Sequence, residues 1–174
     1  MSTRLSGPIL GGVKRLAPTS LLLLSCLLLI PGTAGARSRA SYRSSTERVV
    51  LDLLNTIRRQ HHLPAFTPST ALRSAAREHS ADMLARQYFE HNAPDESFDH
   101  RIRRHLDSAL VGENIAWGTG KYATPEGLVK LWMRSPTHRH IILLRELHRV
   151  GLGVAIGTFD GSPGAAMATA DFAA

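Results

Sequence analysis

The stretch RVGLGVAIGTFDGSPGAAMATADF, residues 149–172, has the pattern of two neighbouring β-strands. Residues 149–157 combine β-branched residues with regularly placed glycines, and residues 166–172 form a second apolar run. The segment between them contains DGSPG at residues 160–164, and aspartate, glycine and proline favour turns. The sequence therefore predicts an antiparallel β-hairpin over this stretch.

Apolar residues recur at helical spacing in the part of the chain that precedes the hairpin. A first helix is predicted over residues 49–57, and its repeat stops ahead of Pro64. A second helix begins behind Ser69 or Thr70. Its apolar stripe consists of Leu72, Ala76, His79 and Met83. A histidine on such a stripe is more often a hydrogen-bonded core residue than a ligand, and both interpretations of His79 stay open.

Two short helices are predicted between residues 125 and 142. Thr124 can cap the first, and Pro125 suits a first helical position. Trp132 shares an apolar stripe of this helix and is expected in the core. Pro136 ends that helix and starts the next, which turns His138 toward the side of its aliphatic residues. Helices followed by an antiparallel hairpin indicate an α+β domain.

The first 36 residues have the three parts of a secretory signal peptide. Basic residues come first, residues 21–30 form an apolar run, and the small residues 34–36 suit cleavage after Ala36. The run is shorter than the roughly 20 residues of a transmembrane helix, so none is expected in the mature protein. We therefore expect a secreted protein with a flexible leader over residues 37–45 and one domain over 46–174. Lipidation at Cys26, the only cysteine, is the alternative.

Charge gives little support for a nucleic-acid partner. Three of the 21 basic residues and none of the 14 acidic ones precede residue 37, so cleavage lowers the net charge from +7 to +4. Arg101, Arg103 and Arg104 form only a short basic cluster beside Asp99 and Asp107, whereas nucleic-acid binders usually carry a longer basic stripe. A solvated basic face is expected, and attraction to an anionic cell envelope is the alternative.

Six short motifs occur in series between residues 49 and 172. They are AREHSADM (76–83), YFEH (88–91), FDHRI (98–102), GENIA (112–116), WMRSPTHRHIIL (132–143) and VGLGVA (150–155). Together they resemble the bacterial branch of the CAP superfamily, named for cysteine-rich secretory proteins, antigen 5 and pathogenesis-related 1 proteins. The resemblance implies an α-β-α sandwich, with a small antiparallel sheet between helical layers, in a secreted or surface-attached protein.

The resemblance also implies a cavity lined by two histidines and two glutamates. His91 in YFEH matches the first histidine, Glu113 in GENIA the first glutamate, and His138 is the candidate for the second histidine. Ser135 stands where eukaryotic members carry the second glutamate, so the set is incomplete, and His79 is added because its stripe faces inward. In some members the histidines bind a divalent metal such as zinc, which makes His91 and His138 the candidate metal ligands.

Two classes of function remain open for these residues. Two imidazoles and a carboxylate could hold zinc for metal-assisted hydrolysis, with Glu113 as the base. The same side chains could instead form a hydrogen-bonded cluster beside a ligand-binding cleft. The sequence contains no nucleophile elbow, phosphate loop or catalytic cysteine, and no residue is assigned as catalytic. The preferred hypothesis is a monomeric, non-catalytic binding module for a lipid, cell-wall or protein ligand, with the metal-dependent hydrolase as the alternative.

Overall fold

A computed structural model describes residues 41, 42 and 44–174. The expected signal peptide, its cleavage site and residues 37–40 of the expected leader lie outside the described residues. The helices are α1 (Ser44–Gln60), α2 (Thr70–Arg86), α3 (Phe98–His105), the 3-10 helix η1 (Gly120–Tyr122), α4 (Pro125–Arg134) and α5 (Pro136–Leu143). The strands are β1 (Ser41–Tyr42), β2 (Thr67–Pro68), β3 (Val111–Gly118), β4 (Arg149–Phe159) and β5 (Ser162–Ala173). Among the described helices, none combines the length and apolar character needed to cross a membrane.

The sheet is built around the hairpin that the sequence predicts. Its order is β1-β4-β5-β3 with antiparallel neighbours, and the two-residue strand β2 adds a parallel pairing to β4. The hairpin turns at Asp160 and Gly161, whose φ angles are 46° and 69°. Along the β3–β5 pairing, Glu113 lies directly opposite Asp171, so these two side chains are neighbours on one face of the sheet.

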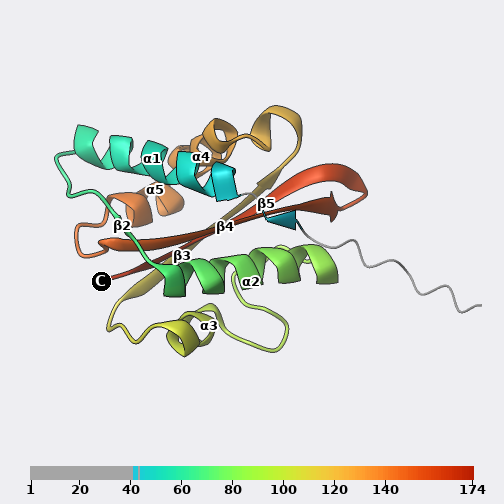
Figure 1. Cartoon of the computed structure of the whole chain (residues 1–174), viewed down its shortest axis with the longest axis horizontal. Helices are drawn as coiled ribbons and strands as arrows, with labels where there is room; N and C mark the ends of the chain where they lie inside the picture. Colours follow the sequence, from blue (N-terminus) through green and yellow to red (C-terminus); the bar gives the residue numbers. More distant parts are fainter. Residues whose placement is uncertain (1–40, 43) are drawn as a thin grey trace, which may run out of the picture. The chain divides into compact units, whose positions relative to one another are not determined.

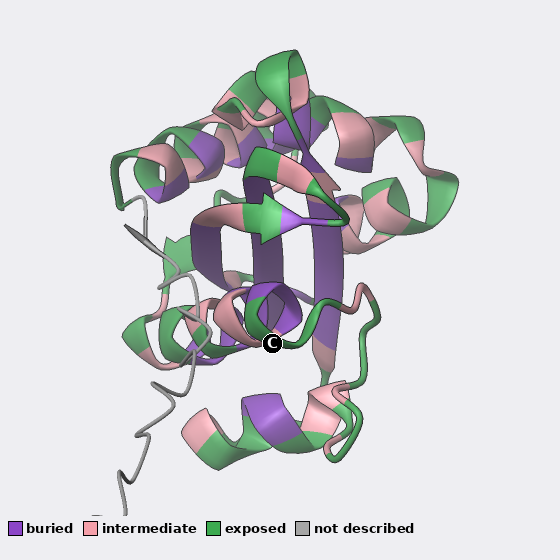
Figure 2. Cartoon of the chain, turned by 90° about the vertical axis from the view of Figure 1, so that its right-hand side faces the viewer, coloured by how far each residue is buried: buried purple, intermediate pink, exposed green. Residues whose placement is uncertain are grey.

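Helices cover both faces of the sheet, which confirms the expected α+β sandwich. In Figure 1, α1, α4 and α5 lie on one side of the strands, and α2 and α3 lie on the other. Figure 2 shows that the long strands are buried between these two helical layers. The main apolar core lies under α1 and α4 and contains the fully buried side chains of Trp132 and Phe172. Trp132 therefore occupies the core position expected from its helical stripe.

The stretch GENIAWG forms an element that the sequence analysis did not predict. It forms strand β3, paired along its whole length with β5. Gly118 is required by packing, because a Cβ there would lie 2.5 Å from the Cβ of Tyr122 in η1.

A second difference from the sequence prediction lies near the N-terminal edge of the domain. Helix α1 begins at Ser44, and strand β1 (Ser41–Tyr42) pairs with β4. Strand β1 and the first residues of α1 therefore lie in the segment that was expected to be a flexible leader.

Helix α2 packs closely on β4 because glycines face it. A Cβ on Gly153 would lie 2.4 Å from the backbone carbon and oxygen of Ala76, and the helix backbone cannot yield as a side chain would. We expect Gly153→Ala to lower the free energy of unfolding by about 2–3 kcal/mol through overpacking. Gly157→Ala is the matched control, since its Cβ would meet only the end of the Leu84 side chain, at 3.1 Å. Urea denaturation measures both, and equal losses would contradict this account of the α2–β4 contact.

Candidate functional site

Glu113 is the centre of a buried polar cluster on the side of the sheet covered by α2 and α3. Its side chain is 1% exposed, and both carboxylate oxygens have protein partners. His91 Nδ1 lies 2.8 Å from Oε1, and Arg101 Nη2 donates to Oε2. His79 Nε2 is 3.9 Å from Oε2. We call Glu113, Arg101, His91 and His79 the Glu113 cluster. Three of the four residues expected in the cavity, all except His138, therefore meet at this point.

Arg101 is a site residue that the sequence reasoning missed, because it was assigned to a surface basic cluster. Its side chain is 2% exposed, and besides Glu113 it contacts the carbonyl oxygen of His91. Helix α3 places it there, since Phe98, Arg101 and Ile102 follow the i, i+3, i+4 spacing of one helix face. That spacing in FDHRI was the signal available in the sequence. A buried guanidinium requires a counter-charge, and Glu113 supplies it.

His79 is a neutral, hydrogen-bonded core residue. Its side chain has no exposed surface, and burial is the largest cause that lowers its pKa from the ordinary value. Nε2 donates to the carbonyl oxygen of Glu90 at 3.0 Å, which fixes the tautomer because a carbonyl can only accept. Tyr88 Oη lies 3.4 Å from Nδ1 and donates to Asp82 at 2.6 Å. This arrangement matches the core interpretation of His79.

His138 lines a cavity of about 260 Å³ whose lining includes no residue of the Glu113 cluster. The backbone fixes its position, because Asn114 Nδ2 of β3 donates to the His138 carbonyl oxygen at 3.0 Å. Burial, followed by the charge of His91, lowers the pKa of His138. We call this the His138 cavity. Its lining residues are Phe89, Ile115, Ala116, Trp117, Leu131, Trp132, Ser135 and His138.

Asp171 is a second buried carboxyl group that the sequence reasoning missed. It has no exposed surface, and its two oxygens lack a donor from the described residues. Burial, followed by the negative charge of Glu113, raises the pKa of Asp171 well above its ordinary value. The protonated form of the side chain is therefore favoured by its surroundings. In that form it can donate a hydrogen bond to Glu113, which a carboxylate cannot do.

The donor set of the Glu113 cluster does not fit a hydrolytic zinc centre. Glu113 has both oxygens engaged, and the guanidinium of Arg101 beside it opposes a bound cation. His91 already uses Nδ1 for Glu113. Only one nitrogen of His91 and the imidazole of His138 remain, fewer than the three protein ligands of catalytic zinc sites. In the part of the chain that is described, no group of three or more His, Cys, Asp or Glu residues could hold a metal ion.

The fold and these motifs define a CAP domain. The profile of the CAP family, the cysteine-rich secretory protein family, matches residues 51–169, and the chain belongs to this family. It is 35% identical over 118 residues to the uncharacterized protein YkwD of Bacillus subtilis, a match that covers 67% of this chain and 45% of YkwD. The uncharacterized membrane protein YlbC of the same organism is 30% identical over 129 residues, or 73% of this chain and 36% of YlbC. The chain thus spans less than half the length of these relatives.

Solved structures share the same fold. An extracellular protein with an SCP domain from Bacillus anthracis is 29% identical with a TM-score of 0.62, covering 74% of this chain and 40% of that one. An outer surface protein of Borrelia burgdorferi has a TM-score of 0.66 at 16% identity, covering 76% of this chain and 96% of that one. At 16% identity, the similarity to the Borrelia burgdorferi protein is a similarity of fold alone.

Removing the Glu113 carboxylate leaves the Arg101 guanidinium buried without a counter-charge. We expect Glu113→Ala to cost about 3–5 kcal/mol of unfolding free energy, the range for breaking a buried ion pair. Glu113→Gln keeps one acceptor oxygen and should cost less. The control is Glu126→Ala on α4, where an exposed side chain predicts a change within about 0.5 kcal/mol. Chemical denaturation at neutral pH compares the three, and losses at Glu113 as small as the control would contradict the buried pair.

The raised pKa of Asp171 predicts a definite sign for the pH dependence of stability. The folded state keeps a proton that the unfolded state releases above about pH 4, so this residue's contribution becomes less favourable as pH rises toward the folded pKa. Asp171→Asn removes this loss, so its stability relative to wild type should increase as the pH rises above about 4.5. Asp99→Asn is the control, because a hydrogen bond from Ser97 lowers the pKa of Asp99, so its own pH dependence falls below about pH 4 and its profile above pH 4.5 should run parallel to that of wild type. A parallel pH profile for Asp171→Asn and wild type would refute a protonated Asp171.

Proposed function

We propose that this CAP-domain protein is a secreted, monomeric, non-catalytic binding module, and that the His138 cavity takes part of a lipid, cell-wall or protein ligand. The observation that carries the proposal is the engagement of both Glu113 oxygens by Arg101 and His91. A carboxylate held in this way stabilises the fold and orients His91, and it is not free to act as a base on water. Secretion is supported by the signal-peptide pattern and by the likeness to an extracellular SCP-domain protein.

The chemistry of the His138 cavity favours an apolar group that carries a hydrogen-bond acceptor. Its walls are mostly aromatic and aliphatic, with Ser135 and His138 as polar members. Ser135 and the imidazole of His138 can each donate a hydrogen bond, so they match an oxygen atom of a ligand. The volume of about 260 Å³ suits one group of a larger ligand, such as an acyl chain end, a sugar ring or a side chain.

His91 links the buried cluster to the surface. Its side chain is 47% exposed, while its Nδ1 atom is hydrogen-bonded to Glu113. With Nδ1 facing the carboxylate, Nε2 is the ring nitrogen that remains for a ligand group. Glu113 therefore supports binding by holding the ring of His91 in one orientation.

Intrinsic fluorescence tests the proposal directly, because the two tryptophans of the chain, Trp117 and Trp132, both line the cavity. Octanoate, triacetylchitotriose and a leucine-containing tripeptide serve as acyl, glycan and peptide probes. At least one should shift the emission saturably, and His138→Ala should weaken that probe about fivefold, equivalent to about 1 kcal/mol. His140→Ala, an exposed neighbour on α5, should leave the affinity unchanged.

Two results would overturn the proposal. One is a saturable response that His138→Ala leaves intact, which would place the probe elsewhere. The other is stoichiometric zinc in the purified protein that is lost in both His91→Ala and His138→Ala, together with zinc-dependent hydrolysis. That second result would favour the metal-dependent hydrolase.

A further inference from the structure

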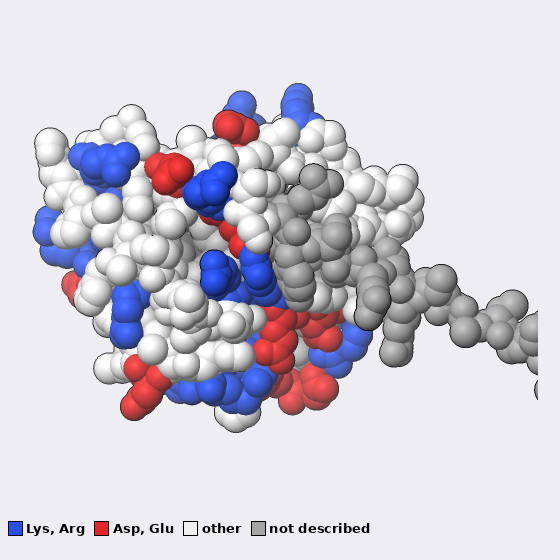
Figure 3. Space-filling model, in the orientation of Figure 1, with Lys and Arg blue, Asp and Glu red and all other residues white. Residues whose placement is uncertain are grey.

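A cavity of about 440 Å³ lies at the edge of the sheet, between α1 and the start of α2. Residues of β4 line its base, α1 supplies one wall, and the junction between β2 and α2 supplies the other. In Figure 3, which has the orientation of Figure 1, basic side chains lie on both sides of a hollow between α1 and α2. We call this cavity the edge cavity. It shares no lining residue with the His138 cavity.

The edge of β4 is open at the base of the edge cavity. Strand β2 pairs with β4 only as far as Val150, and β1 pairs with it only near its other end. The Val150 carbonyl oxygen accepts from the Ser69 N–H at 2.8 Å, and the Val154 N–H donates to Glu47 at 3.3 Å. Leu152 lies midway between these two residues, and alternate residues of a strand point their N–H and C=O groups to the same side. Leu152 therefore presents both groups to the cavity, and no described strand pairs with it on this edge.

The edge cavity carries positive charge that the protein does not neutralise. Arg48 of α1 and Arg73 of α2 line it, and neither forms an ion pair with another described residue. The one carboxylate in the lining, that of Glu47, is already paired, because Nε and Nη2 of Arg77 donate to it at 2.8 and 2.7 Å. Guanidinium groups bind anions through charge-assisted hydrogen bonds. The lining therefore favours a negatively charged ligand group.

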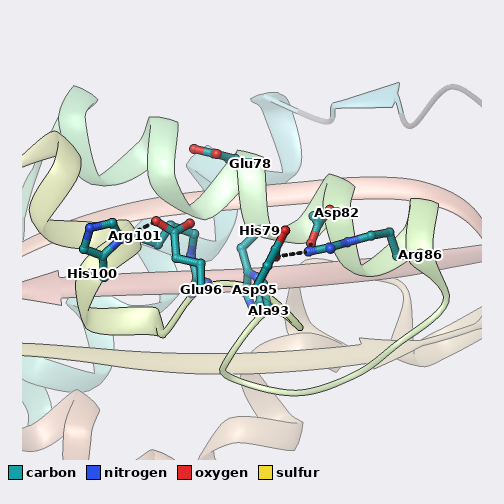
Figure 4. Close-up of a pocket in the computed structure, with 9 residues that line it drawn as sticks. All are labelled: Glu78, His79, Asp82, Arg86, Ala93, Asp95, Glu96, His100 and Arg101. Carbon is teal, nitrogen blue, oxygen red and sulfur yellow. Dashed lines mark hydrogen bonds and ion pairs between the residues drawn. The ribbon is translucent and has the colours of Figure 1, made fainter.

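The cavity between α2 and the segment that leads into α3 provides a contrast (Figure 4). Its four carboxylates are all engaged in ion pairs, and Arg86, for example, lies 2.6 Å from Asp82 and 2.9 Å from Asp95. That network satisfies its own charges and leaves little for a ligand. In the edge cavity, Arg48 and Arg73 have no such partners among the described residues.

The strands that flank the open edge limit what can enter the edge cavity. Because β1 and β2 occupy the β4 edge on either side of Leu152, an added strand could not continue in either direction. The end of a chain needs only one residue's length of this edge. A C-terminal carboxylate lies directly beside the last peptide group, which suits a cavity that holds both guanidinium groups and the Leu152 N–H. Leu51 and Pro68 add apolar surface for the side chain of that residue.

We propose that the edge cavity binds the C-terminal residue of a peptide, with the terminal carboxylate on Arg48 and Arg73 and the carbonyl oxygen of the last peptide group on the Leu152 N–H. Two separate observations call for the two halves of this ligand, the unpaired guanidinium groups and the open strand edge. A capped C-terminus lacks the charge, and a simple carboxylic acid lacks the peptide group. The site does not rest on the function proposed for the His138 cavity.

Three probes separate the two halves of the ligand. They are acetyl-Ala-Ala-Leu with a free carboxylate, the same peptide with a C-terminal amide, and 4-methylpentanoate, which keeps the carboxylate and the alkyl group. The backbone amide signal of Leu152 in a proton–nitrogen NMR spectrum of the protein reports directly on the strand edge. The free acid should shift this signal saturably and slow its hydrogen exchange. The other two probes should bind at least about fivefold more weakly.

Two variants with the same loss of charge complete the test. Arg73→Gln removes one guanidinium group from the edge cavity and should weaken binding of the free acid about fivefold. Arg139→Gln changes an exposed residue of α5 outside the lining and should not weaken it. His138→Ala should also leave the binding unchanged, which distinguishes this site from the function proposed above. Circular dichroism of each variant confirms that it is folded.

The proposal is overturned if either of the two incomplete probes binds as tightly as the free acid, or if the Leu152 signal does not respond. A loss in Arg139→Gln as large as that in Arg73→Gln would also overturn it, because the effect would then be one of overall charge. Inorganic phosphate is the final probe. Phosphate that displaces the free acid at equal concentration would show a general anion site and refute the peptide ligand.

Discussion

The buried ion pair between Arg101 and Glu113 is the contact on which the arrangement of the site depends. It joins α3 to the edge strand β3, and each partner is almost without exposed surface. Neither charge could remain buried alone, because an unpaired ion in the interior costs far more than its packing contributes. Burial raises the pKa of Asp171 and lowers the pKa of His79, so the neutral forms of both side chains are favoured beside the pair. This balance explains how GENIAWG can carry a carboxylate inside a strand that is buried on both faces.

The helices and the hairpin could be predicted because their signals are local. Ser69 and Thr124 cap α2 and α4 as expected, each accepting a hydrogen bond from a backbone N–H three residues later. His79 faces inward because helical periodicity fixes its direction. Local signals are sufficient to predict an element wherever the spacing of its own apolar residues determines which of its faces is buried.

The remaining features depend on partners that are distant in the sequence or on a different element. Strand β3 is covered on both faces, so it lacks the alternation that marks a half-buried strand, and no strand was predicted there. Burial of Arg101 makes sense only once Glu113, on another element, is known to lie beside it. Asp171 is a similar case, because its neighbour is set by strand register rather than by local spacing. Family resemblance located Glu113 and His91 but gave no signal for these two partners.

Exposed and buried ion pairs of α2 and α3 differ in their response to ionic strength. Arg86 bridges Asp82 and Asp95, and Arg104 bridges Glu78 and Glu96, whereas Arg101 pairs with Glu113 in the interior. Arg86 and Arg104 are each more than one third exposed, whereas Arg101 is nearly fully buried. Dissolved ions screen exposed charges over about 8 Å at physiological salt and about 3 Å at 1 M, and they screen buried pairs much less. A rise in ionic strength therefore weakens these two exposed bridges more than it weakens the buried pair of the Glu113 cluster.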